Sequence, residues 1–454
     1  MINRIRIQPK AIEVPDDDPF KHDLLGRRAF AETLAATLGA IDGPGVFAID
    51  GGWGTGKTTF VAMFSQHLRN DHFRVVNINA WETDYGDDPL SALVSSLADA
   101  EEDATRKDSF KRTALGLLKV VAPPAIRIAT SGLLNLDAAF EKGAGDVLAK
   151  FAENGLARFE EHAKSMAAFK ERLAELADDD GHKPLVVIVD ELDRCRPTYA
   201  VEMLETIKHA FDVDKLIFVL AVNRQQLDQS AAVLYGTSSD PESYFRRFFD
   251  VESRLPDADR AAVVRTLLRG LEADTDRPSV DLLANVLAAS PYSIRVMNGL
   301  LRHYAVVTSA LTPYKPDVWS WLLPVTVLLR QALGPGYHDF IAGRSSDERL
   351  IAGFFDLPWA AVLRGTRSGN MIEAAVIAVA AHRHHHEVGN GLGSALLPRY
   401  QADPESPHAT EVVHFVAMLA KTMNLYGSAL KVVSDRLETF DLSGLKPTAG
   451  QQLR

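Results

Sequence analysis

The feature that most constrains the fold of this sequence is a glycine-rich stretch between two apolar segments. Residues 51–58, GGWGTGKT, fit the pattern G-x-x-x-x-G-K-[ST]. The run VFAID at 46–50 has the composition of a buried strand, and TFVAMFSQHL at 59–68 has the apolar spacing of a helix. A strand, a glycine loop and a helix in this order hold phosphate groups in α/β proteins. The chain is therefore expected to build a sheet around this loop.

The spacing of the motif has a physical reason. Glycines let successive backbone N–H groups point at phosphate oxygens, and the helix N-terminus adds its positive end. In this arrangement Lys57 reaches the β- and γ-phosphates, Thr58 coordinates Mg²⁺, and Trp53 is a packing or lid residue rather than a catalyst. The predicted nucleotide-binding residues are Gly51, Gly52, Trp53, Gly54, Thr55, Gly56, Lys57, Thr58 and Thr59.

Further apolar runs predict the rest of a parallel sheet. LVVIVDELD at 185–193 and KLIFVLAVN at 215–223 are near-continuous apolar strands of the kind buried on both faces, and a helical pattern at 202–211 separates them. FRVVNINAW at 73–81 and FFDVESRLP at 248–256 predict two more strands. Strands that alternate with helices indicate a doubly wound α/β fold.

The chain has 454 residues, enough for two to four structural units. We predict an α/β core at 1–256 with a long helical insertion at about 85–180, a helical lid at 257–310 and an all-α C-terminal region of unknown role at 311–454. Hydrophobic residues make up 46% and charged residues 24% of the chain, as in ordinary globular proteins.

Two acids end the strand at 185–190. A phosphate loop needs a carboxylate at the end of a neighbouring strand to hold the magnesium shell, and Asp190 supplies it. Glu191 follows at the strand tip, where a carboxylate polarises the attacking water as a general base. The pair indicates hydrolysis; the alternative is a strand that merely ends in acidic turn residues.

The run Asp190-Glu191-Leu192-Asp193-Arg194-Cys195 resembles the D-[DE]-L-D-R-C signature of KAP P-loop NTPases. NAWE at 79–82, FVLAVNR at 218–224 and DLLGR at 23–27 resemble other elements of that family in the same order, so the resemblance covers about residues 20–300. It implies an additional-strand P-loop ATPase core with a helical lid, ATP and Mg²⁺ as cofactors, and Gly26 and Arg27 near the nucleotide base.

The resemblance also implies roles for four later residues. Asn223 stands where the family often has an acid and suits a sensor that hydrogen-bonds water or the γ-phosphate; strand-end capping is the alternative. Arg246 and Arg247 are placed where ring ATPases put an arginine finger that acts in trans; a salt bridge with nearby acids is the alternative. Arg295 resembles a lid arginine that contacts the nucleotide.

The remaining sequence features bear on DNA binding, cellular location and membrane contact. Lys+Arg 49 against Asp+Glu 60 gives a net charge of −11, which disfavours non-specific coating of DNA but leaves a local basic face open. The N-terminal sequence lacks the apolar region of a secretory signal, so a cytoplasmic protein is expected. Lys111–Asn135 is apolar with only basic charges; a buried or surface helix pair is favoured there over weak membrane contact.

Two further groups of side chains could suggest a nucleophile or a metal site, but we expect neither role for them. Cys195 is the single cysteine, which excludes an internal disulfide, and a buried thiol is favoured over a nucleophile because no histidine partner is near in sequence. His382 and His386 would share one face of a helix, but no third ligand can be identified for a metal.

The favoured function is therefore a Mg²⁺-dependent, ATP-hydrolysing switch or oligomeric motor of the KAP type. Members of that family often occur in bacterial systems that exclude phages or in plasmid-encoded exclusion. A homo-oligomer and a protein partner from the same system are expected. The alternatives are a small-molecule kinase, which shares the phosphate loop, and a nucleotide-gated DNA-binding or scaffold protein.

Overall fold

The computed structural model describes residues 13–86, 88–121, 145–178, 183–235, 245–270, 277–311, 317–386 and 394–424. The chain divides into two compact units at Pro256. Residues 13–23 and 27–256 build the first, here called the sheet unit, and Leu24–Gly26 with the residues from Asp257 onward build the second, the helical unit. Each unit is described by itself.

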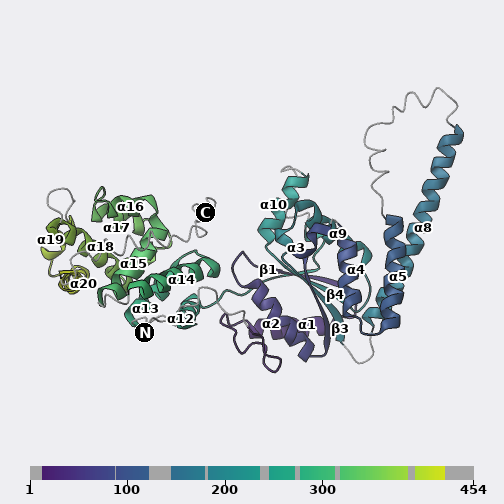
Figure 1. The fold of residues 1–454 in the computed structure, drawn as a ribbon, viewed down its shortest axis with the longest axis horizontal. Helices are drawn as coiled ribbons and strands as arrows, with labels where there is room; N and C mark the ends of the chain where they lie inside the picture. The colour runs from purple at the N-terminus through teal and green to yellow at the C-terminus, as the bar shows by residue number, and fades with distance from the viewer. Residues whose placement is uncertain are drawn as a thin grey trace. The chain divides into compact units, whose positions relative to one another are not determined.

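The sheet unit contains a five-stranded parallel sheet in the order β2-β3-β4-β1-β5 (Figure 1). This confirms the predicted α/β fold with a doubly wound sheet. Asp50 at the end of β1 pairs with Val222, and Asp190 at the end of β3 pairs with Ala221, so the carboxyl ends of three strands meet at one edge. The strands are β1 (Gly45–Asp50), β2 (Phe73–Asn79), β3 (Lys183–Asp190), β4 (Leu216–Val222) and β5 (Val251–Arg254).

The sheet contains the additional strand that the family resemblance implies, because β4 lies between β1 and β3. Asp190 therefore ends a strand that is not, as first expected, the immediate neighbour of the strand before the glycine loop. Apolar patterning identifies strands but not which of them pair. The two loops still meet, since both follow the carboxyl ends of strands in register with β4.

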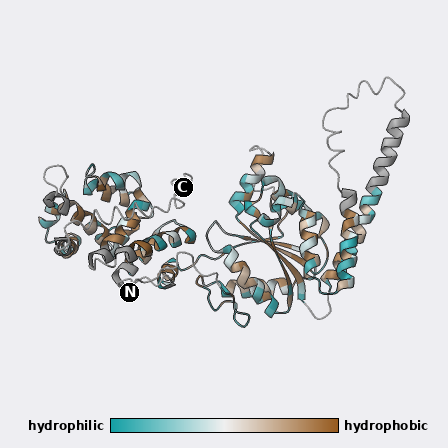
Figure 2. Ribbon diagram, in the orientation of Figure 1, coloured by the Kyte–Doolittle hydropathy of each residue, from teal (hydrophilic) through white to brown (hydrophobic). Residues whose placement is uncertain are grey.

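Alternate residues of the central strands β1, β3 and β4 pack on opposite faces of the sheet, and Figure 2 shows apolar strands at the centre of the sheet. Val187 and Val189 of β3 join the core that includes α4 (Pro89–Ala100) and α9 (Pro197–Ala210). Val186 and Ile188 join the core that includes α1 (Arg28–Gly39) and α2 (Lys57–Asn70). Helices on both faces make the sheet doubly wound, and they fix the position of its edges.

The segment between β2 and β3 is a helical insertion, as predicted. Its elements are α3 (Ala80–Thr83), η1 (Asp84–Gly86), α4, α5 (Ala104–Val121) and α8 (Gly145–Ala177). A row of aromatic rings attaches it to the sheet: the ring centroids are 5.6 Å apart for Phe110 and Phe169, 5.5 Å for Phe169 and Phe211, and 5.8 Å for Phe211 and Phe218 of β4. Residues 122–135 of the stretch considered for membrane contact lie outside the described residues. Within the described part of the chain, no helix is long and apolar enough to cross a membrane.

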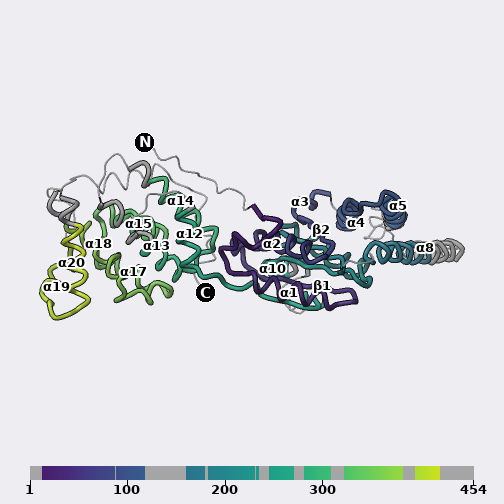
Figure 3. Tube along the Cα trace, turned by 90° about the horizontal axis from the view of Figure 1, so that it is seen from below, coloured from purple at the N-terminus to yellow at the C-terminus, as the bar shows by residue number. Residues whose placement is uncertain are grey.

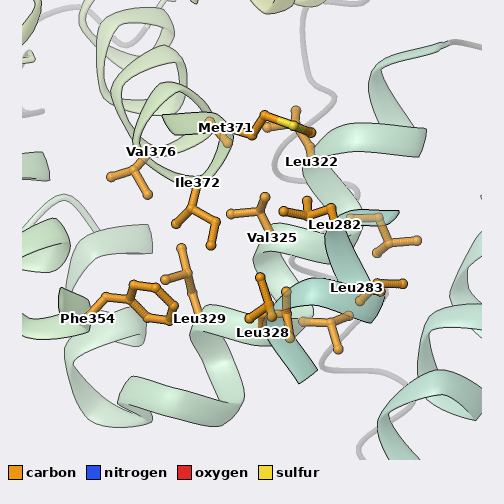
Figure 4. Packing of buried hydrophobic residues seen from close by; sticks show 14 of the residues in the cluster. Leu282, Leu283, Leu322, Val325, Leu328, Leu329, Phe354, Met371, Ile372 and Val376 are labelled. Atoms are coloured by element: carbon orange, nitrogen blue, oxygen red, sulfur yellow. The ribbon is translucent and has the colours of Figure 1, made fainter. Parts of the chain in front are cut away.

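The helical unit has one hydrophobic core that draws on residues from Val264 to Leu419. Figure 4 shows side chains of α13, α15, α17 and α18 meeting in it, among them Leu282, Leu328, Phe354 and Ile372. The predicted lid at 257–310 and the predicted C-terminal region at 311–454 thus share a core. The elements, which Figure 3 shows from a second side, are α12 (Arg260–Gly270), α13 (Arg277–Ala289), α14 (Ile294–Leu311), α15 (Asp317–Leu333), α16 (Pro335–Ile341), α17 (Asp347–Phe355), η4 (Ala361–Leu363), α18 (Arg367–His386), α19 (Leu397–Gln401) and α20 (Pro407–Asn424).

The first turn of α18 is closely packed, so a substitution there tests the packing of this unit. A Cβ atom at Gly369 would lie 2.1 Å from the backbone oxygen of Leu363, and at Gly353 of α17 only 3.9 Å from a side-chain carbon of Leu333. We expect Gly369→Ala to lower the free energy of unfolding by about 1–3 kcal/mol, because backbone must shift. Gly353→Ala, the matched control, should be neutral or slightly stabilising since alanine favours helix. Urea unfolding of the full chain measures both, and equal stabilities would contradict the predicted clash.

Candidate functional site

The glycine loop joins the end of β1 to the start of α2, as the motif predicts. Gly54 and Gly56 have φ angles of +73° and +89°, in the left-handed region that glycine enters without strain. A Cβ atom at Gly51 would lie 3.1 Å from Thr55 Oγ1, so this position also admits no side chain without movement. The loop therefore has the shape in which backbone N–H groups and a helix N-terminus face one ligand.

Lys57 begins α2 and is buried. Its Nζ donates to the backbone oxygen of Gly51 and lies 3.9 Å from Asp193 Oδ2. Burial lowers the pKa of Lys57, and the carboxylates of Asp193 and Asp190 oppose that shift most strongly. The Lys57 ammonium therefore lies among negative groups and is already positioned to bind a phosphate.

Thr58 and Asp190, the two predicted metal ligands, lie close to each other. Burial raises the pKa of Asp190, and the neighbouring Thr58 hydroxyl is the main opposing influence. Asp190 Oδ1 also accepts the backbone N–H of Glu191 at 2.8 Å. A hydroxyl and a carboxylate oxygen at a phosphate loop are the donors that Mg²⁺ uses together with substrate phosphates and water, so these residues fit that ion.

Glu191 lies beside this pair in an uncommon backbone conformation, with φ at +64°. Its Oε1 accepts the hydroxyl hydrogen of Thr58 at 3.1 Å, and its Oε2 forms an ion pair with Arg194 Nε. The guanidinium of Arg194 also lies 5.9 Å from the ring centre of Trp81. Burial raises the pKa of Glu191 most strongly, and the negative charge of Asp190 raises it further. A carboxylate with a raised pKa near a phosphate loop is suited to accept a proton from water.

Arg27 supports the loop from its backbone side. Its buried guanidinium donates to the oxygens of Thr55 at 2.9 Å, Gly56 at 3.4 Å and Pro256 at 3.2 Å. The resemblance placed Gly26 and Arg27 near the nucleotide base, and that role stays a prediction. Sequence reasoning missed the support that Arg27 gives, because the three oxygens belong to backbone and leave no sequence pattern.

Asn223 follows β4 at the same edge of the sheet. Its backbone oxygen accepts from Gln226 and Leu227 at 3.1 Å each, and its side-chain oxygen accepts from the Gln226 N–H at 3.4 Å. These contacts cap the N-terminus of α10 (Arg224–Tyr235). The sensor role stays a prediction.

Arg246 and Arg247 lie at the opposite edge of the sheet. Both are exposed and precede β5, and the nearby Asp250 N–H donates to Val46 O at the beginning of β1, 2.8 Å away. A strand rises about 3.3 Å per residue, so the six residues of β1 put this segment about 15–20 Å from the glycine loop. Arg295 is exposed on α14 of the helical unit, and its contact with nucleotide stays a prediction.

A comparison with protein families matches residues 27–283 to the KAP family P-loop domain. The match spans more than half of the chain and includes the glycine loop, Arg27, Asp190, Glu191 and Asn223. The chain belongs to the KAP family of P-loop proteins. This confirms the resemblance drawn from the D-E-L-D-R-C run. The family match supports nucleotide binding at the site of this KAP protein.

The other comparisons add little. A search of curated proteins finds no match. Solved structures that are similar include domain III of the Thermotoga maritima replication initiation protein DnaA, with 17% identity, a TM-score of 0.33 and coverage of 70% of this chain and 97% of that one. The Aeropyrum pernix ORC2 protein, in ADPNP–ADP complexes, has 14% identity and a TM-score of 0.36 over 95% of this chain and 97% of that one. These scores are too low to bear on function.

The histidine hypothesis gains no support from the structure. α18 extends to His386, but the side chains of His382 and His386 lie outside the described residues. Among the residues that the structure describes, no group of histidine, cysteine and acidic side chains is arranged to hold a metal ion.

Cys195 gives a test of the geometry at the end of β3. Burial raises the pKa of its thiol to about 12, and its Sγ lies 3.7 Å from the backbone oxygen of Glu191. We expect the native protein to react slowly with a maleimide at pH 8, because thiol rather than thiolate is present, and to be labelled fully in urea. Mass spectrometry counts the label on this single cysteine, with Cys195→Ala as the blank. Rapid labelling of native protein would show an open, ionised thiol instead.

Proposed function

We propose that this KAP protein binds ATP with Mg²⁺ and hydrolyses it, and that the two nucleotide states drive a molecular switch or an oligomeric motor. The observation that supports this best is the contact of Thr58 with Glu191 and Asp190, which gathers a metal-binding hydroxyl, a metal-binding carboxylate and a candidate base beside Lys57. Hydrolysis uses all three groups, with the base taking a proton from the attacking water.

Each residue has a defined task in this proposal. Lys57 and the backbone N–H groups of residues 51–58 bind the β- and γ-phosphates, and Thr58 and Asp190 hold the Mg²⁺, which neutralises developing phosphate charge. Glu191 takes a proton from water as the water attacks. Its Oε2 is bound to Arg194 in the structure, so that ion pair must open or turn before this oxygen can serve a water molecule.

Hydrolysis is useful to a switch only if ATP and ADP are bound differently by its conformations. Asn223 and Arg295 are the groups we propose to sense the γ-phosphate, from the sheet unit and the helical unit respectively. The place of this protein in phage exclusion or plasmid-encoded exclusion, and its protein partner, rest on the family resemblance. We also propose a cytoplasmic setting, with which a chain of one cysteine is compatible.

Two variants separate binding from hydrolysis. Lys57→Ala should lose ATP binding, because the buried ammonium is the cation nearest the phosphates, whereas Glu191→Gln should bind ATP and release phosphate at least 100-fold more slowly, in line with loss of a general base. Phosphate release and calorimetric binding of ATP measure the two effects. Arg112→Ala, an exposed arginine on α5, is the control that should change neither.

Three results would contradict this function. Phosphate release by Glu191→Gln at the wild-type rate would remove the proposed base. Transfer of phosphate only to an added small-molecule acceptor would favour the kinase alternative. Salt-dependent DNA binding gated by ATP, without hydrolysis, would favour the DNA-binding alternative.

Arg246 and Arg247 support a homo-oligomer in this proposal. They are exposed and lie at the sheet edge opposite the glycine loop, so either could reach a phosphate site only in a second copy. An arginine finger stabilises the charge of the transferring phosphoryl group.

A mixing experiment tests the finger. Arg246→Ala/Arg247→Ala and Glu191→Gln should each be inactive alone, because the first lacks the finger and the second lacks the base. Mixed, they should regain ATPase activity, since the intact finger of the Glu191→Gln copy can complete the intact site of the other. Mixed oligomers of confirmed mass without any activity would speak against a finger in trans.

A further inference from the structure

The buried carboxylate of Asp193 has no task in the function proposed so far. It lies in η2 (Leu192–Arg194), directly after β3, and its side chain is 1% exposed. Its Oδ2 accepts the indole N–H of Trp53 at 2.6 Å and lies 3.9 Å from Lys57 Nζ. Its Oδ1 is buried without a hydrogen-bond partner among the described residues. Both polar contacts of this side chain thus go to residues of the glycine loop.

Trp53 depends on this contact for its orientation. The residue is 50% exposed, so burial alone does not hold the indole in place. It sits at the tip of the loop, next to Gly54 and two residues before Thr55, whose hydroxyl donates back to Gly52 O at 2.8 Å. Arg27 holds the other end of the loop at Thr55 and Gly56. Among the hydrogen bonds of the described residues, the one from Trp53 to Asp193 attaches the tip to another part of the protein.

The two residues of this bond follow different strands of the sheet. Trp53 follows β1 and Asp193 follows β3, with β4 between them, and the residues are 140 positions apart in sequence. A hydrogen bond to a charged acceptor is about twice as strong as one between neutral groups. It fixes the phosphate loop relative to Asp190 and Glu191, which lie on the same segment as Asp193.

We infer that Asp193 is a positioning residue, which holds the phosphate loop against the end of β3 through the indole of Trp53 before nucleotide binds. The inference rests on the proposed function, because the position matters only if the loop and the β3 acids act on one nucleotide. A loop held in its binding conformation loses less conformational entropy when ligand binds. Removing the bond should therefore weaken nucleotide affinity while the fold is kept.

Four variants test this bond by calorimetric titration with ATP, with Mg²⁺ and again with EDTA. Trp53→Phe keeps the ring but loses the N–H, and Asp193→Ala loses the acceptor; each should weaken ATP binding about tenfold. Their double variant should be no weaker than the weaker single variant, because both remove the same bond. Asp193→Asn keeps an acceptor oxygen and should stay within about threefold of wild type. Circular dichroism checks that each variant folds.

Trp81→Phe is the matched control, an exposed tryptophan at the same edge that faces Arg194 rather than Asp193. It should bind ATP as the wild type does. Wild-type affinity in Trp53→Phe, multiplied losses in the double variant, or an Asp193→Asn as weak as Asp193→Ala would each overturn the inference. These outcomes differ from a failure of the proposed function, in which the wild type itself does not bind ATP or Lys57→Ala binds it equally well.

Discussion

The site depends on one buried ammonium group and the carboxylates around it. Burial lowers the pKa of Lys57 and raises the pKa of Asp190, so each charge by itself is unfavourable in this place. Together they compensate each other, as buried ion pairs must, and the loss of one partner leaves an uncompensated charge. The same balance prepares the site for its proposed ligand, because a phosphate can replace the carboxylates as the partner of Lys57 without new desolvation of the ammonium.

The parallel sheet is what brings these groups together. Its central strands β1, β3 and β4 are buried on both faces, and their parallel pairing sets their carboxyl ends at one edge. Polar residues can then follow each strand without entering the core. The site is thus composed of short loops whose positions are decided by the packing behind them, in line with the general placement of ligand sites in open α/β sheets.

The sequence was informative where a local pattern carries the structure. The glycine loop, the strand before Asp190, the helical insertion and the family signature all follow from runs of neighbouring residues. Contacts between distant segments could not be predicted in this way. The bond of Trp53 to Asp193 and the guanidinium of Arg27 on backbone oxygens have no periodic signal, and apolar spacing shows that a helix buries a face but not which helix covers it. The shared core of residues before and after 311 was missed for that reason.

The opposite placement of the glycine loop and of Arg246 and Arg247 has a consequence for symmetry. A contact in which these arginines meet the phosphate site of another copy joins two different surfaces, so it is heterologous, and a two-fold dimer cannot contain it twice through one self-complementary patch. Each added copy exposes another glycine loop and another segment with Arg246 and Arg247. Every copy can use both surfaces only in a closed ring, whereas a filament leaves one phosphate site at its end without an arginine. The number of subunits in a ring would then be set by the angle at which two sheet units meet.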